Sequence, residues 1–239
     1  VGADTVTKLL QGDFPGFEEL KDKEKYFPTL VDLPADGASL PLTRMGCKMA
    51  TGSGKTLVMA MIITWAFCNR GKNPASTQFP NAVLVCAPNL TVRSRLQVLR
   101  PDVENNYYDQ FNLAPATYRE YLNIGKVMVT NWHTFALASE NSEGGKSYKV
   151  VQKGEESPEA FAKNRLAELA DRLPLLVLND EGHHCWRPAP ASVAMADKLD
   201  DDQESVLKED VEEARVWLAG LDRINNSGLA GTENGVPRR

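Results

Sequence analysis

One short segment constrains the fold of this 239-residue chain more than any other feature. Residues 49–56 read Met-Ala-Thr-Gly-Ser-Gly-Lys-Thr, after the apolar stretch 45–49 and before the long apolar run 57–68. This order predicts a strand, a glycine-rich loop and a helix. Gly52 and Gly54 let successive backbone N–H groups turn toward one point, where the helix also aims its positive end, so a polyphosphate fits there.

Two side chains of this loop predict chemistry as well as binding. We expect Lys55 to reach the β- and γ-phosphates of a nucleotide, and the Thr56 hydroxyl to complete the coordination of a Mg²⁺ ion. The usual first glycine of the pattern G-x-x-x-x-G-K-T is Met49 here, and a glycine-rich turn without chemistry is the alternative interpretation. The expected phosphate contacts are Thr51, Gly52, Ser53, Gly54, Lys55 and Thr56.

A second segment, about 120 residues later, supplies carboxylates. Residues 175–181 form an apolar run that ends in Asp180 and Glu181, as expected of a buried parallel strand with its chemistry at the C-terminal end. Neighbouring strand residues point to opposite sides, so we expect Asp180 to hold Mg²⁺ and Glu181 to orient and deprotonate the attacking water. Swapped roles are one alternative. An acidic strand end that caps the next helix is the other, and the paired loop disfavours it.

The same two segments resemble a known family. The quartet Asp-Glu-Gly-His at 180–183 resembles the DEAH-type Walker B box of superfamily 2 helicases, with Gly182 in place of the usual alanine. The loop at 49–56 is similar to the version found in helicase subunits of type I and type III restriction enzymes, and the resemblance runs from about residue 44 to about residue 225. It implies ATP and Mg²⁺ as cofactors, with Glu181, Asp180 and Lys55 as catalytic residues and His183 coupling the nucleotide site to the nucleic-acid site.

Two further segments resemble the nucleic-acid motifs of this family. Residues 84–96 are similar to motif Ia, the strand and loop that touch the nucleic-acid backbone, and residues 127–135 are similar to the next backbone-contacting motif. For Trp132 both base stacking and core packing are open, and we favour the core because it lies between a strand and Phe135. The contacts that the resemblance implies fall on Pro88, Asn89, Arg93, Thr130, Asn131 and Trp132.

The resemblance implies a fold and a function. The expected fold class is α/β: a three-layer RecA-like P-loop NTPase domain with a mainly parallel sheet, truncated before the motif III strand. The expected function is that of the ATP-binding lobe of an ATP-dependent DNA helicase or translocase, which moves on duplex DNA when joined to a second RecA-like lobe. A modification or nuclease subunit is a further implied partner. The alternatives are a non-catalytic module that binds nucleotide or a partner, and a P-loop ATPase that does not act on nucleic acid.

The pattern of apolar residues and loops divides the chain into three parts. We expect an irregular N-terminal extension at 1–43, the ATP-binding domain at 44–225 and a polar tail at 226–239. Within the domain, the pattern predicts a strand at 82–87, a mobile insertion at 138–156, and helical segments at 57–70, 91–99, 158–172 and 203–224.

Charge and cysteine usage narrow the expected partners and compartment. The formal net charge is −5, of which −7 falls between Asp197 and Glu213, so the rest carries +2. We therefore expect a nucleic-acid backbone to be held by a few groups such as Arg93 and Arg95, without a broad basic surface. Four cysteines without paired spacing predict free thiols in a reducing cytoplasm, and the run 57–68 is too short to cross a bilayer, so no membrane partner is expected.

Two clusters invite other interpretations. Residues 101–125 are rich in tyrosine and phenylalanine; stacking on bases is conceivable, but we favour packing of this loop onto the core. His183, His184 and Cys185 are potential zinc ligands, but three adjacent residues do not easily converge on one ion, so we disfavour a zinc site.

Overall fold

We describe the chain from a computed structural model. The structure describes residues 29–32, 42–47, 49–76, 79–136, 156–172, 174–185, 201–228, 232–233 and 236–237. The mobile insertion expected at 138–156 lies outside these residues except for Glu156.

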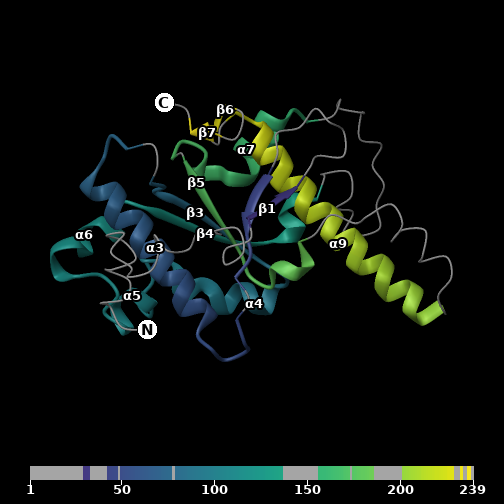
Figure 1. Cartoon of the computed structure of the whole chain (residues 1–239), viewed down its shortest axis with the longest axis horizontal. Coiled ribbons are helices and arrows are strands. Elements are labelled where there is room, and N and C mark those ends of the chain that lie inside the picture. Colours follow the sequence, from purple (N-terminus) through teal and green to yellow (C-terminus); the bar gives the residue numbers. More distant parts are fainter. Residues whose placement is uncertain are drawn as a thin grey trace, which may run out of the picture.

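A three-stranded parallel sheet lies at the centre of the described residues (Figure 1). The middle strand, β3 (Ala82–Ala87), pairs with β4 (Lys126–Asn131) on one side and with β5 (Leu175–Asn179) on the other. All six residues of β3 are buried, which confirms the strand predicted at 82–87. Because the strands are parallel, the segments that follow them leave from the same edge of the sheet.

Helices cover both faces of this sheet. The even-numbered residues of β3 join the hydrophobic cluster under α7 (Pro158–Leu166) and α9 (Asp201–Asn226), here called the α9-side cluster. The odd-numbered residues join the cluster under α3 (Lys55–Lys72), called the α3-side cluster. This alternation follows from the pleat of a strand, whose successive side chains point to opposite faces. Figure 1 shows α3 and α9 on opposite sides of the strands, and the predicted three-layer α/β fold is confirmed.

The helix bounds differ from the predictions, most of all at the end of α7. The helix predicted at 91–99 is α4 (Leu90–Arg95) followed by a 3₁₀ turn, Leu96–Leu99. The segment predicted to be helical over 158–172 begins as α7 with Ser157 accepting a hydrogen bond from the Ala160 N–H, and α7 ends where Ala167 takes φ 44°, followed by a 3₁₀ turn at Ala167–Leu169. α3 and α9 extend two residues beyond both predicted ends.

The segment between β3 and β4 packs beside α3. It contains the short helices α5 (Tyr107–Gln110) and α6 (Arg119–Leu122), with a 3₁₀ turn at Ala116–Tyr118. Gly71 lets α3 and α6 approach closely, because a Cβ atom at residue 71 would lie 2.2 Å from the Tyr121 ring. Tyr108 is buried, and its hydroxyl donates a hydrogen bond of 2.6 Å to the Leu99 carbonyl, so this residue packs into the core as expected.

The prediction of a strand immediately before the glycine-rich loop is wrong for the residues that the structure describes there. β2 (Leu42–Met45) ends at Met45, and residues 46–50 are not assigned to a strand where the structure describes them. β2 pairs antiparallel with β1 (Thr29–Asp32), so part of the extension expected to be irregular is a strand. The apolar spacing at 45–49 indicated extended backbone but could not identify its partner. In the polar tail, β6 (Thr232–Glu233) and β7 (Val236–Pro237) pair with each other.

Candidate nucleotide site

The glycine-rich loop opens directly into the N-terminus of α3. Gly52 and Gly54 have φ of 77° and 91°, in the left-handed region that favours glycine, and Gly54 is the N-cap of the helix. No residue in the first turn of α3 is acidic, so no carboxylate of that turn offsets the positive helix end. The unpaired N–H groups of a first helical turn bind anions, and the loop therefore has the backbone form of a phosphate site.

The loop residues before Gly54 are exposed. Thr51, Gly52 and Ser53 are open to solvent, whereas Gly54, Lys55 and Thr56 are half-buried. Ser53 closes the turn on itself, because both its N–H and its hydroxyl donate to the Ala50 carbonyl, at 3.2 and 2.6 Å. The Ser53 hydroxyl is thus used within the loop, and contact with phosphate is left to the backbone and to Lys55.

The end of β5 is fixed by the sheet and then turns sharply. The Asp180 N–H donates a 2.9 Å hydrogen bond to the Cys86 carbonyl, which extends the β3–β5 ladder by one residue beyond Asn179. Glu181 then takes φ 49° and ψ 46°, a left-handed conformation that is uncommon for a residue with a side chain. Such backbone strain is found preferentially at functional sites.

Lys55 and Glu181 meet across the two segments. The Lys55 Nζ lies 2.6 Å from the Glu181 Oε1, and the two residues are 126 positions apart in the chain. This hydrogen bond raises the pKa of the Lys55 ammonium; partial burial opposes the rise, and the charges of Glu181 and Asp180 add to it. The lysine side chain is 30% exposed and the glutamate 36%, so the pair lies in an accessible place where a phosphate can compete for the ammonium.

Oxygen ligands suited to Mg²⁺ lie on both sides of this pair. Thr56 follows Lys55 in the first turn of α3, and Asp180 precedes Glu181 at the end of β5. A hydroxyl and a carboxylate are the hard oxygen donors that Mg²⁺ selects, usually together with waters and phosphate oxygens. The residues expected from the sequence to hold the metal thus fit that ion in chemistry. The His183 side chain lies outside what the structure describes.

The expected nucleic-acid residues lie at the C-terminal ends of β3 and β4, the same edge of the sheet that carries Asp180. Asn89 accepts the Val92 N–H as the N-cap of α4, and the exposed Arg93 donates from its Nε to the Val129 carbonyl at 3.3 Å. Pro88, which precedes them, is half-buried. The α4 loop is therefore tied to β4, and Arg93 stays exposed.

The residues at the C-terminal end of β4 are more enclosed than the sequence suggested. Thr130 and Asn131 are buried, and their side chains bond locally, Thr130 Oγ1 to Thr134 Oγ1 at 2.5 Å and Asn131 Nδ2 to His133 Nδ1 at 3.1 Å. Trp132 stacks on the His133 ring with centroids 3.8 Å apart and packs against the α9-side cluster. This packing favours the core interpretation of Trp132.

Two polar contacts from α9 reach the β5 end, and the sequence analysis did not anticipate them. The buried Trp217 donates from its Nε1 to the Asn179 Oδ1 at 3.2 Å. One helical turn earlier, Glu213 Oε2 lies 3.7 Å from His184 Nδ1. The only sequence signal was Asn179 itself, a polar residue at the end of an otherwise apolar strand.

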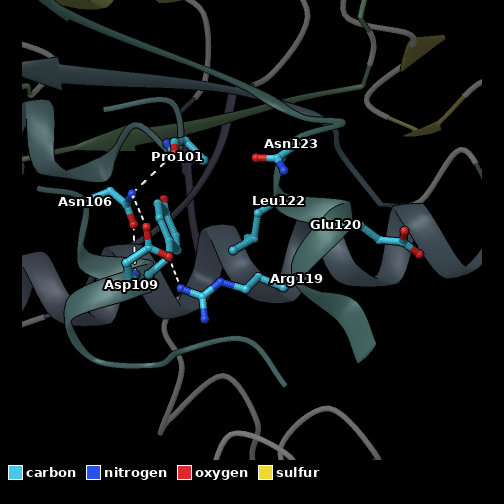
Figure 2. A pocket seen from close by; sticks show the side chains of 8 residues that line it. Pro101, Asn106, Asp109, Arg119, Glu120, Leu122 and Asn123 are labelled. Atoms are coloured by element: carbon cyan, nitrogen blue, oxygen red, sulfur yellow. Dashed lines mark hydrogen bonds and ion pairs between the residues drawn. The ribbon is translucent and has the colours of Figure 1, made fainter. Parts of the chain in front are cut away.

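A separate pocket of about 370 Å³ lies on the segment between β3 and β4 (Figure 2). Asp109 forms an ion pair with Arg119 and accepts a 2.9 Å hydrogen bond from the Asn106 amide, which also donates to backbone carbonyls. None of its lining residues belongs to the predicted site. Asp109, Arg119 and Asn106 bond one another, so we assign this hollow no role in nucleotide binding.

The fold and the paired segments define a class of protein, an α/β domain of the P-loop type with a helicase-like ATP-binding site. A model of the family described as type III restriction enzyme, res subunit, matches residues 40–207. The chain belongs to this family, and the resemblance to superfamily 2 helicases and the RecA-like fold class are confirmed. Comparisons with curated proteins and with solved structures returned no match.

Two simpler expectations can also be compared with the structure. All four cysteines are free thiols; burial raises the pKa of Cys68 to about 11 and that of Cys86 further still. None of the helices that the structure describes is long and apolar enough to span a membrane.

Proposed function

We propose that this chain is the ATP-binding lobe of an ATP-dependent DNA helicase or translocase. The observation that carries the proposal is the 2.6 Å contact between Lys55 and Glu181, which joins the phosphate-binding loop to the acidic strand end. Family membership supports a helicase-like ATPase domain, which uses a nucleotide and acts on nucleic acid. The finer assignment, hydrolysis coupled to movement on duplex DNA, is our proposal.

The proposed reaction assigns a separate task to each side chain. When a nucleotide enters, Lys55 exchanges the Glu181 carboxylate for the β- and γ-phosphates, and the N–H groups of residues 52–56 surround those phosphates. Glu181, released from the lysine, orients a water and takes its proton as the water oxygen bonds to the γ-phosphorus and the bond to the ADP oxygen breaks. Thr56 and Asp180 would hold the Mg²⁺ ion, which would neutralise developing charge on the phosphates.

A second RecA-like lobe is the proposed partner for turnover. In NTPases generally, an arginine that stabilises the transition-state charge contributes about 10³ to 10⁵ in rate. Our assignments leave this role to the second lobe, so we expect slow hydrolysis by this chain alone. DNA is proposed to contact the α4 loop, with Pro88, Asn89 and the exposed Arg93 as the candidate contacts and His183 as the coupling residue. Thr130, Asn131 and Trp132, which the resemblance also implied, are left out because their side chains are buried or packed on the core.

Calorimetry of Mg·ATP binding tests the proposal first. The chain and its Lys55→Ala variant are titrated with Mg·ATP, with and without duplex DNA. We expect binding by the unaltered chain and a loss of about 10- to 100-fold in affinity in Lys55→Ala, because a charge-assisted hydrogen bond to phosphate is removed. Equal binding by both would contradict the assignment of Lys55, and no binding by either would show that this chain is not a working nucleotide site.

A further inference from the structure

Helix α9 contacts the residues on either side of the two carboxylates. Trp217 bonds to Asn179, which directly precedes Asp180, and Glu213 lies near His184, which follows Glu181 by three residues. Residues 213 and 217 are four apart and so share one face of the helix. One helix face therefore contacts both ends of the turn that carries Asp180 and Glu181.

The direction of the Asn179 side chain follows from the strand. Leu175 and Val177 of β5 pack against the α9-side cluster, whereas Leu176 and Leu178 pack against the α3-side cluster. Alternation places Asn179 on the α9 side, where it meets the Trp217 indole, and places Asp180 on the α3 side, where the glycine-rich loop lies. The contact with α9 thus orients the strand end and leaves Asp180 on the side of the sheet where Lys55 lies.

The hydrogen bond between Trp217 and Asn179 is not needed to bury these two side chains. Trp217 has no exposed surface and belongs to an apolar cluster, in which a leucine at position 179 would bury as well as an asparagine. Replacing both partners of a buried hydrogen bond by apolar groups of similar shape is close to neutral for stability. What the polar pair adds is direction, because a hydrogen bond fixes an angle and a register and apolar packing does not.

We propose that Asn179 and Trp217 are positioning residues for the nucleotide site, with Glu213 and His184 as a second contact on the same helix face. They hold the end of β5 so that Asp180 reaches the metal and Glu181 reaches Lys55. The proposal rests on the proposed function for its consequence in ATP binding. Its structural content, the fixing of the Asp180–Glu181 turn by α9, can be measured without nucleotide.

Two variants separate the hydrogen bond from the packing. Asn179→Leu removes the acceptor but keeps the number and branching of the side-chain heavy atoms, and Trp217→Phe removes the donor but keeps an aromatic ring. Tyr108→Phe is the matched control, because it removes a 2.6 Å hydrogen bond from a ring that is equally buried, on the other face of the sheet. The double variant Asn179→Leu/Trp217→Phe leaves neither group of the pair unsatisfied.

The first readout is hydrogen exchange at the Asp180 amide, whose bond to the Cys86 carbonyl continues the ladder. After correction for global stability by urea unfolding, we expect exchange to be about 3- to 10-fold faster in both single variants and unchanged in Tyr108→Phe. The double variant is expected to recover stability but to keep the faster exchange. Exchange that matches the control, or that returns to the original rate in the double variant, would overturn the proposal.

The second readout is the gain in ATP affinity on adding Mg²⁺, compared with ATP in EDTA. We expect the gain to fall about 3- to 10-fold in the single and double variants, because the gain reports the metal contact through Asp180. Affinity without metal is the reference, since any weakening of the Lys55–Glu181 contact affects both titrations. An unchanged gain in a chain that binds Mg·ATP would also overturn the proposal. If the unaltered chain binds no ATP, the proposed function fails, and the exchange rates alone decide whether α9 fixes the turn.

Discussion

The loop that carries Lys55 and the strand end that carries Asp180 are supported in opposite ways. Residues 51–53 are exposed, and a Cβ atom added at Gly52 would meet no atom within 4 Å. The β5 end is bonded to β3 through its backbone and to α9 through Asn179. The difference indicates that the loop half of the proposed site depends on its ligand to fill it, whereas the carboxylate half is arranged in advance by the core.

The largest expected effect comes from breaking the core under the carboxylates. Trp217→Ala should lower the free energy of unfolding by about 3–5 kcal/mol, because it deletes a fully buried ring and leaves a cavity. Thr51→Ala, in the exposed loop, should change it by less than about 0.5 kcal/mol. Urea unfolding measures both, and a similar cost for the two would remove the contrast between the halves.

The next effect concerns the backbone of the loop. Gly54→Ala should cost about 1–2 kcal/mol of stability, because residue 54 has φ 91° and an alanine is strained there whatever space it finds. Gly46→Ala is the control, since a Cβ at Gly46 meets nothing within 4 Å and that glycine is not in the left-handed region. Thermal unfolding compares the two, and equal losses would show that φ at Gly54 is not the cause.

A smaller effect tests the Lys55–Glu181 contact, which joins the two halves. Glu181→Gln removes the negative charge that competes with phosphate for Lys55 and also lessens the rise in the lysine pKa. We expect affinity for Mg·ATP to rise by ~2- to 5-fold, as befits a partly exposed ion pair. Calorimetry measures the change, and weaker binding would mean that Glu181 contacts the bound nucleotide favourably.

The smallest effect lies outside both halves and serves as a baseline. The Arg119 guanidinium, and then the Asn106 amide, lower the pKa of the Asp109 carboxyl below its usual 3.8. The ionised carboxylate therefore stabilises the fold above pH 3.8, and this stabilisation is lost as the pH falls through the lower pKa of the folded state. Asp109→Asn should cost less than about 1 kcal/mol at neutral pH, because the pair is exposed. The cost should shrink below pH 3.8 in acid-unfolding curves; a cost independent of pH would contradict this cause.

The sequence predicted the parts of the fold whose signals are local. Ala82–Ala87 is an apolar run of strand length, and the Gly-Ser-Gly-Lys-Thr order marks a turn before a helix, so both were recognisable from neighbouring residues alone. The end of α7 was not, because Ala167 has φ 44° without a glycine to signal it. The same limit applies to β2, whose antiparallel partner β1 no local pattern specifies.

The candidate site was predicted to the same extent. Lys55, Asp180 and Glu181 were chosen as candidates from residue type and spacing, and the structure brings Lys55 and Glu181 into contact. The hydrogen bond between Trp217 and Asn179 joins a helix residue to a strand residue 38 positions earlier in the chain. Nothing in the sequence around either residue indicated the other. Contacts that depend on how a helix packs on a sheet require the assembled fold.

The distance in sequence between Lys55 and Glu181 has a consequence for folding. Their contact closes a loop of 126 residues, so the site does not exist until the helix after the loop and all three central strands have come together. A partly folded chain therefore has no complete site for a nucleotide. Under the proposed function, ATP would bind the finished domain alone and shift the folding equilibrium toward it, so nucleotide binding would report that this domain has completed folding.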